Sequence, residues 1–503
     1  MRIFLFLLFC LPVSNPSFAK DIAATVSLFP IPNSREVCID THLRVMLPEG
    51  CEVGKKGFIR IYDLTARCEV DCLDLSLPAG PTVSQPNNPS AIYTPVPYIY
   101  RTGHITNRNT LPGTPSGAAA KSADIGRYQL TIIGGFSDGF HFYPVLVRGR
   151  EAVIYLHHNV LEYGHQYEVR MDKDVFPKLG RLRWRFTTKA EKPKAEGRIV
   201  DVNADGTADF ATVQGALDFI PDSLPGENAR MTVRIANGDY EELVYFRNKR
   251  FVTLEGQSRE GVVIHYPNNE VFNPHPADIK TNELKGTFPS RRAAFAADNC
   301  HDMVFRNLTL RTDCHGQAEG FLLNGERNFV ENVHVIGSGD ALQTNGSAYF
   351  LNCIIDGEGD TILGRGAAFF NHCSLSSIGP FMWIRNTEDN HGNVFLDCTF
   401  RGIGKGAVIA RLPSNHGKNY PHAEAVLLNC TLDNIPSSGF FPVAEEARTA
   451  TLLEFNSHTP DGNPVDVSGR HPVVRQLHPV RDAQLIAKYS DWRFVLKCDS
   501  LPY

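Results

Sequence analysis

Two aspartates in a glycine-rich stretch of the chain are the first candidates for chemistry. Residues 337–364 read GSGDALQTNGSAYFLNCIIDGEGDTILG, in which Asp340 and Asp360 each follow a glycine. Two neighbouring carboxyl groups can catalyse a reaction together when one is ionised and the other keeps its proton. These aspartates can do so only if the fold brings residues that are twenty positions apart side by side.

A repeated sequence pattern surrounds the two aspartates. The segments FRNLTL, VENVHV, FLNCII, FNHCSL, FLDCTF and LLNCTL each carry Asn, Asp or His before an apolar residue or Cys. These apolar or Cys positions are Leu308, Val333, Cys353, Cys373, Cys398 and Cys430, at intervals of 25, 20, 20, 25 and 32 residues. Short strands repeated at such intervals are typical of a solenoid. We therefore predict an all-β fold, a right-handed parallel β-helix, in which the four cysteines stack as free residues in the interior.

The repeat also predicts the separation of the aspartates. Asp340 follows Val333 by seven residues, and Asp360 follows Cys353 by seven, so they occupy equivalent positions on adjacent coils, roughly 5 Å apart. Two carboxylates at that distance cannot both ionise freely, so the pKa of one is raised unless a cation intervenes. One aspartate can then attack while the other donates a proton. Two other interpretations stay open: Asp and Gly simply form turns here, or the stacked carboxylates bind Ca²⁺.

The region before the repeat follows a different pattern. Apolar and polar residues alternate in the segments GFIRIYDL, EAVIYLHH, HQYEVRMD and LRWRFTT, which predicts an antiparallel β-sandwich. We assign this sandwich to residues 20–189, with a long Pro- and Asn-rich loop at 81–126. It resembles bacterial Ig-like modules. The polar segment AEKPKAEG at 190–197 is the predicted linker to a β-helix domain at 198–503.

Residues 1–19 have the features of a secretory signal peptide. Arg2 precedes a short apolar run, and Ser17-Phe18-Ala19 forms a small-x-small cleavage site. The run is too short to span a bilayer, and no later segment is long enough. We expect a protein exported to the periplasm or secreted. Attachment to the outer surface is the alternative, although Cys10 lies inside the apolar run, which disfavours a lipid anchor there.

Composition narrows the possible partners. The 503 residues are 42% hydrophobic and carry a formal net charge of −5, which argues against nucleic acid because no basic excess is available to neutralise phosphates.

Four early cysteines could pair as disulfides in an exported protein: Cys38, Cys51, Cys68 and Cys72. DVNADG at 201–206 begins like an EF-hand loop but has Thr212 at its twelfth position. We therefore predict neither a metal ion nor another cofactor.

From about Asp201 to the C-terminus the chain resembles the pectin methylesterase family. The resemblance rests on segments that occur in the family's order: DVNADGTADFATVQGALDFIP, NGDYEE, GTFPS, GQAEGF, SGDALQ, GDTILG, ARLP and DWRF. It implies an esterase that removes methyl groups from pectin or a related methyl-esterified uronate polysaccharide and releases methanol.

The resemblance also implies roles for single residues. Asp360 stands at the family's nucleophile position and Asp340 at its acid/base position. Gln317 would donate a hydrogen bond to the oxyanion that forms during attack. Arg411 would hold Asp360 charged and oriented.

Other residues are expected to contact the polysaccharide. Thr287 and Phe288 lie in the GTFPS segment, and Gln317 and Arg411 would touch the substrate as well. Trp383 in PFMWIR is either a sugar-stacking residue or part of the core.

Three departures from the family pattern leave other functions open. Gly339 replaces a second oxyanion glutamine, Thr361 and Leu363 replace two phenylalanines, and a tryptophan is missing near Pro413. The alternatives are another acyl-ester or thioester hydrolase, a Ca²⁺-dependent pectate lyase on the same scaffold, or a non-catalytic polysaccharide-binding protein.

Overall fold

A computed structural model of the chain describes residues 26–81, 127–128, 130–134, 139–222, 224–273, 291–411, 420–440 and 449–502. The predicted signal peptide and nearly all of the predicted loop at 81–126 lie outside the described residues. Thr287 and Phe288 also lie outside them, so their predicted substrate contacts stay predictions.

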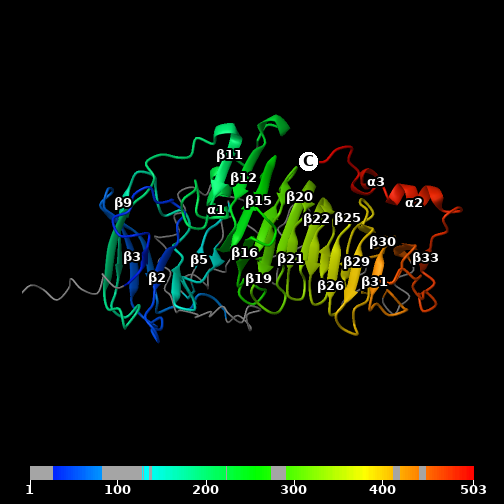
Figure 1. The fold of residues 1–503 in the computed structure, drawn as a ribbon, viewed down its shortest axis with the longest axis horizontal. Coiled ribbons are helices and arrows are strands. Elements are labelled where there is room, and N and C mark those ends of the chain that lie inside the picture. Colours follow the sequence, from blue (N-terminus) through cyan, green and yellow to red (C-terminus); the bar gives the residue numbers. More distant parts are fainter. Residues whose placement is uncertain are drawn as a thin grey trace, which may run out of the picture.

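The N-terminal region contains two four-stranded antiparallel sheets and a two-stranded one, drawn in blue and cyan at one end of the molecule (Figure 1). The first sheet has the order β1 (Leu28–Phe29), β2 (Leu43–Met46), β8 (Glu151–Ile154), β7 (Val145–Arg148). The second has the order β10 (Leu182–Thr187), β9 (Gln166–Met171), β3 (Phe58–Asp63), β4 (Cys68–Asp74). Strands β5 (Leu130–Thr131) and β6 (Phe140–His141) form the small sheet.

The alternating segments form strands of these sheets, as predicted. In β10 the side chains of Leu182, Trp184 and Phe186 are buried, whereas Arg183 and Arg185 are exposed. Successive side chains of a strand point to opposite faces, so the apolar face of β10 turns to the core and the arginine face to solvent.

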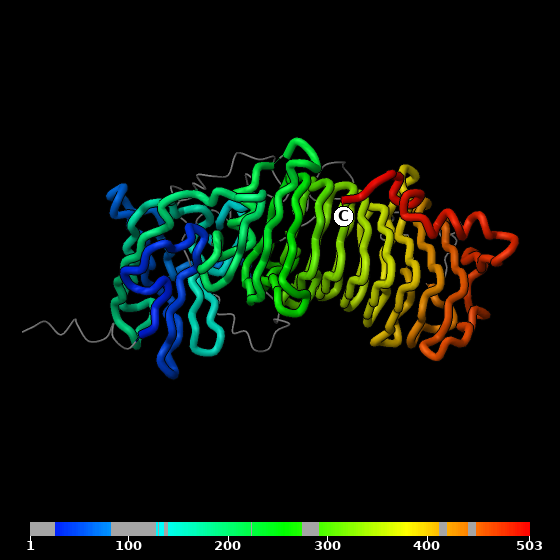
Figure 2. Tube along the Cα trace, turned by 45° about the horizontal axis from the view of Figure 1, so that its top comes forward, coloured from blue at the N-terminus to red at the C-terminus, as the bar shows by residue number. Residues whose placement is uncertain are grey.

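Residues 199–476 form a parallel β-helix, whose stacked coils run across the molecule from green to orange (Figures 1 and 2). The larger sheet contains β11 (Ile199–Val202), β12 (Met231–Ile235), β14 (Val244–Arg247), β15 (Val252–Gly256), β17 (Phe295–Asp298), β18 (Val304–Arg306), β20 (Phe321–Glu331), β22 (Leu342–Leu351), β24 (Ile362–Gly364), β25 (Ala367–Asn371), β27 (Met382–Ile384), β28 (Asn393–Leu396), β30 (Glu424–Leu428), β32 (Thr451–Phe455) and β33 (Val474–Gln476). The other contains β13 (Gly238–Glu241), β16 (Val262–Tyr266), β19 (Thr309–Thr312), β21 (His334–Ile336), β23 (Ile354–Asp356), β26 (Ser374–Ser377), β29 (Thr399–Gly402) and β31 (Thr431–Asp433).

The repeated Asn, Asp or His makes one corner of each coil. These residues have a positive φ of 51–55° and are Asn307, Asn332, Asn352, His372, Asp397 and Asn429. Asn, Asp and His adopt this left-handed conformation more readily than most residues. The residue that follows points inward, so Cys353, Cys373, Cys398 and Cys430 are buried in the core.

The cysteines are free, as predicted for the interior ladder. The backbone N–H of Cys373 donates to Sγ of Cys398 at 3.4 Å, which shows the stacking of successive coils. The four early cysteines likewise form no disulfide with any described residue; they are Cys38, Cys51, Cys68 and Cys72.

The N-terminal sheets pack against the first coils through one shared apolar core. Tyr245, Tyr266 and Phe272 of the coils belong to the same buried cluster as the sandwich residues. Tyr143 stacks on Phe272 with ring centroids 4.6 Å apart, and its backbone N–H donates to the hydroxyl of Tyr266 at 2.9 Å. Because Val244 and Phe246, which flank Tyr245 in β14, belong to the separate interior core, the sandwich packs on an outer face of the first coils.

Helices are few among the described residues. α1 (Val213–Phe219) lies beside the first coils, where Thr212 caps it, and α2 (Ala483–Tyr489) and α3 (Trp492–Leu496) follow the last strand. Trp492 stacks on Tyr349 of β22, so the C-terminal helices cover an outer face of the coils. None of the described helices is long and apolar enough to cross a membrane.

Candidate active site

The β-helix places Asp340 and Asp360 at the same corner of adjacent coils. Each precedes a strand of the larger sheet, β22 for Asp340 and β24 for Asp360, and Leu342 pairs with Ile362 in parallel register. The backbone N–H of Ala341 donates to the carbonyl oxygen of Thr361 at 3.0 Å, directly beside the two aspartates. Parallel strands lie about 4.8 Å apart, so the register agrees with the predicted pairing.

Asp340 is buried and faces a guanidinium group. Its Oδ2 accepts a very short hydrogen bond from Nη2 of Arg292, which also binds Glu319. Burial raises the pKa of Asp340 to about 7; the Arg292 charge opposes this shift, while Glu319 and Asp360 add to it. Near neutral pH Asp340 is therefore a carboxyl group that can hold or release a proton.

Asp360 is less buried and pairs with a second guanidinium. Nη1 of Arg411 donates to its Oδ2 at 2.6 Å, as the resemblance implied. Its Oδ1 accepts a hydrogen bond from none of the described residues. Burial raises the pKa of Asp360 above its usual value, and Arg411 opposes the shift. The carboxylate thus has one oxygen held by Arg411 and one that is buried without a hydrogen-bond donor among the described residues.

The cause of the raised pKa differs from the one predicted. The sequence predicts that the neighbouring carboxylate raises one pKa unless a cation intervenes, whereas burial is the largest cause for both aspartates. The mutual charge effect is smaller because each carboxylate has its own arginine, Arg292 for Asp340 and Arg411 for Asp360.

Gly339 has a backbone reason for replacing glutamine. Its φ is +69°, and a Cβ added there would lie 3.1 Å from the carbonyl oxygen of Gly316. A side chain at this position would be strained and crowded. Gln317 is exposed on the adjoining loop, and its Cα lies 3.8 Å from the same added Cβ. Gln317 is therefore beside the aspartate corner, with its side chain open to solvent.

Trp383 packs in the core, one of the two roles that the sequence left open, and it also borders the aspartates; its stacking on a sugar stays a prediction. It is partly buried and packs against the β-helix core. On β27 it pairs with Leu363, and the guanidinium of Arg411 lies 4.4 Å from its ring centroid. The ring is thus a wall of the site as well as a packing residue.

Sequence reasoning missed three charged residues of the site: Arg292, Glu319 and Arg385. The first follows the GTFPS segment, the second lies two residues after Gln317, and the third lies two after Trp383. Their closeness in sequence to these candidate motifs is the signal that could have identified them as site residues.

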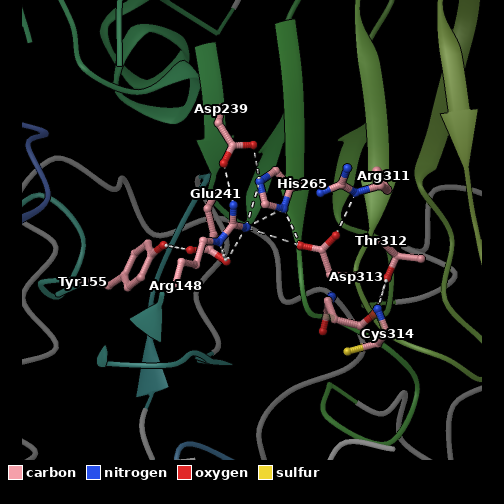
Figure 3. Close-up of polar contacts among 10 residues, drawn as sticks. Arg148, Tyr155, Asp239, Glu241, His265, Arg311, Thr312, Asp313 and Cys314 are labelled. Carbon is pink, nitrogen blue, oxygen red and sulfur yellow. Dashed lines mark hydrogen bonds and ion pairs between the residues drawn. The ribbon is translucent and has the colours of Figure 1, made fainter. Parts of the chain in front are cut away.

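A second cluster of charged residues joins the sandwich to the coils, as Figure 3 shows. Glu241, His265 and Asp313 place their ligand atoms within 4.8 Å of one another. Arg148 of β7 reaches into this cluster, and its Nη2 lies 2.7 Å from Oε1 of Glu241 and 3.8 Å from Oδ2 of Asp313. Because a guanidinium already neutralises these carboxylates, we interpret the cluster as structural.

Removing this guanidinium should destabilise the protein. Arg148→Met leaves the buried carboxylate of Glu241 without its guanidinium, whereas Asp313 keeps its contacts with Arg311 and His265, so we expect the free energy of unfolding to fall by about 3 kcal/mol. Arg234→Met is the control, because Arg234 and Asp201 form an exposed pair, worth less than about 1 kcal/mol. Urea denaturation of both variants tests this, and equal losses would contradict the structural role.

The fold and the site together define a parallel β-helix protein with a two-aspartate centre. The sequence profile described as Pectinesterase matches residues 199–494, more than half of the chain. The chain therefore belongs to the pectinesterase family.

Individual relatives match in part. "Probable pectinesterase 49" of Arabidopsis thaliana is 28% identical over 243 residues, which are 45% of this chain and 62% of the relative. "Pectinesterase" of Ralstonia solanacearum is 30% identical over 179 residues, 31% of this chain and 44% of the relative. The chain thus spans less than two thirds of the length of either relative.

Two solved structures with a similar backbone are pectin methylesterases. The enzyme from carrot has 19% identity and a TM-score of 0.48, covering 59% of this chain and 92% of its own. PemA from Erwinia chrysanthemi has 21% identity and a TM-score of 0.46, covering 60% of this chain and 98% of its own.

Proposed function

We propose that this protein removes methyl esters from pectin, or from a related methyl-esterified uronate polysaccharide, and releases methanol. The observation that carries the proposal is the pair of aspartates on adjacent coils. Asp360 has one oxygen held by Arg411 and one without a hydrogen-bond donor among the described residues, and Asp340 has a pKa of about 7. This is the division of roles that a carboxylate-catalysed ester cleavage needs.

In the first step, the ionised carboxylate of Asp360 attacks the ester carbonyl carbon. The C–O bond to the methoxy group breaks, and protonated Asp340 gives its proton to the departing oxygen, so methanol leaves. The products are methanol, an acyl group joined to Asp360 and an ionised Asp340, whose charge Arg292 stabilises.

In the second step, Asp340 accepts a proton from water. The resulting hydroxide attacks the acyl carbon, the bond to Asp360 breaks, and the uronic acid is released with both aspartates restored. Gln317 donates a side-chain N–H to the oxyanion of each step. Its exposed position beside the aspartate corner supports this role.

A methanol-release assay on methyl-esterified pectin tests the proposal. We expect a clear rate that survives a metal chelator, because no step uses a metal ion. Loss of activity on chelation, or formation of an unsaturated sugar without methanol, would favour the lyase alternative. Binding of pectin without any methanol release would favour a non-catalytic protein.

We further propose that residues 1–19 direct export and that the antiparallel sheets form an Ig-like domain. The apolar and polar alternation and the sheet pairing support the second part. Recovery, from the medium or the periplasm, of a protein that has been cleaved after Ala19 would support the first part. Detection of an uncut N-terminus in the cytoplasm would oppose it.

A further inference from the structure

Three carboxylates surround one guanidinium group beside the aspartate corner. Nε of Arg292 donates to both carboxylate oxygens of Glu319, at 2.8 and 2.9 Å. Nη2 of the same guanidinium donates to Oδ2 of Asp340, and its Nη1 lies 3.6 Å from Oε2 of Glu270. The side chain of Glu319 is fully buried, whereas that of Glu270 is 20% exposed. Glu319 is therefore the buried carboxylate that shares the Arg292 charge with Asp340.

The β-helix places these groups on three successive coils. Arg292 precedes β17, Glu319 precedes β20 and Asp340 precedes β22, and these strands are neighbours in the larger sheet. Arg291 anchors the first of these segments to the N-terminal region, because its guanidinium lies 3.9 Å from the ring centroid of Phe140 in β6. The guanidinium of Arg292 is thus held between two coils of the active site and the sandwich.

Glu319 changes what Arg292 does to the aspartate. An arginine beside a carboxyl group favours the ionised form, and an ionised Asp340 has no proton to give to the leaving group. Glu319 accepts from Nε through both oxygens and also from Nη2, at 2.8 Å. A carboxylate held in this way is the natural counterion of the guanidinium, so Asp340 receives only part of its charge.

Four charged groups face Asp340 from the neighbouring coils, and they are Arg292, Glu319, Asp360 and Arg385. Burial raises the pKa of Asp340 to about 7; the two carboxylates add to this shift and the two guanidinium groups oppose it. Asp360 has its own guanidinium partner in Arg411. Tyr245 of β14 faces Glu319, but burial raises the pKa of its hydroxyl, so it adds no charge. Glu319 is thus the group that balances Arg292.

We propose that Glu319, acting through Arg292, is a positioning residue that keeps Asp340 in its proton-donating form and so sets the upper end of the pH range in which the protein cleaves esters. The inference rests on the proposed function for the reaction that needs this proton. It assigns the working pH range to a buried ion pair that never touches the substrate.

The first test uses Glu319→Gln, which keeps the size of the side chain and removes its charge. Loss of this charge favours ionised Asp340, so the alkaline decline of kcat/KM for methanol release should move toward acid by about one pH unit. At a pH above the wild-type decline, kcat/KM should then be about tenfold lower, while its value on the acid side of the decline is kept.

A second substitution in the same molecule should reverse the shift. Arg292→Gln added to Glu319→Gln removes the guanidinium as well, so Asp340 holds its proton more firmly and the decline should return to the wild-type pH or lie above it. Replacing both partners leaves neither half of the pair buried alone, so the double variant should fold.

Glu454→Gln is the matched control. Glu454 forms an equally buried pair with Arg470 at 2.9 Å, in the last coils. Its loss removes the same kind of ion pair far along the chain from Asp340, so the alkaline decline should stay at the wild-type pH. A shift as large as that of Glu319→Gln would show that the effect is not specific to Glu319.

The proton on Asp340 can also be followed without catalysis. Infrared difference spectra recorded across a pH series detect the C=O stretch of a protonated carboxyl group, and the band that Asp340→Asn removes belongs to Asp340. This band should titrate near pH 7 in the wild type and at lower pH in Glu319→Gln.

The two measurements separate the possible failures. If methanol is released but its alkaline decline does not move in Glu319→Gln, the role of Glu319 is wrong. If the Asp340 band moves as expected but no methanol is released, the proposed esterase activity is wrong and the charge balance stands. If the band does not move and no methanol is released, both proposals are wrong.

Discussion

Asp360→Asn is expected to lower kcat for methanol release by at least about 10⁴-fold. The change keeps the shape of the side chain and its acceptor for Arg411, but an amide oxygen cannot form the acyl intermediate. Because the side chain is partly exposed and its partner Arg411 reaches solvent as well, the fold should tolerate the exchange. Methanol release under saturating pectin measures the loss.

Asp397→Asn is the matched control for this variant. Asp397 also lies at a corner of a coil, but its closest charged partner among the described residues is His372, 4.0 Å away. We expect its activity to equal that of the wild type. An Asp360→Asn protein that melts normally and still releases methanol at the wild-type rate would remove Asp360 from the mechanism.

Asp340→Asn is expected to lower kcat by about 10²- to 10⁴-fold, the range for loss of a general acid and base. Arg292 keeps its bonds to Glu319, so the buried cation stays paired in the variant. The residual rate should come from attack by Asp360 without proton transfer to the leaving group.

The pH profile identifies which function of Asp340 is lost. In the wild type the protonated form of Asp340 exists below its pKa of about 7, so kcat/KM should fall as the pH rises through that value. Asp340→Asn has no proton to lose there, and this alkaline decline should disappear from its residual rate. A decline that persists unchanged in the variant would assign the titration to another group.

The pairing of the aspartates could be predicted because it depends on repeat length alone. Val333 and Cys353 mark equivalent corners, and seven residues further on each coil carries an aspartate. The left-handed corner residue and the buried residue after it recur in six successive coils, so local conformation and core packing impose the same period.

The electrostatic surroundings of the pair could not be predicted in the same way. Arg292 reaches Asp340 from a coil 48 residues earlier, and no spacing rule selects one arginine over its neighbour. Gly339 lacks the side-chain oxyanion donor of the family, and the sequence did not show that its positive φ and the nearby carbonyl of Gly316 favour glycine there. Arg385 becomes informative only when its burial is known, because an arginine in a strand is usually a solvated residue.

The most direct test of the account is a double-mutant cycle with Asp340→Asn, Asp360→Asn and the combined variant, measured as methanol release from methyl-esterified pectin. If the two carboxyl groups act on one ester, each single variant loses most of the rate and the combined variant is no slower than the worse of them. If instead the two losses multiply, or either variant keeps the wild-type rate, the aspartates do not work as a unit and the proposed mechanism is wrong.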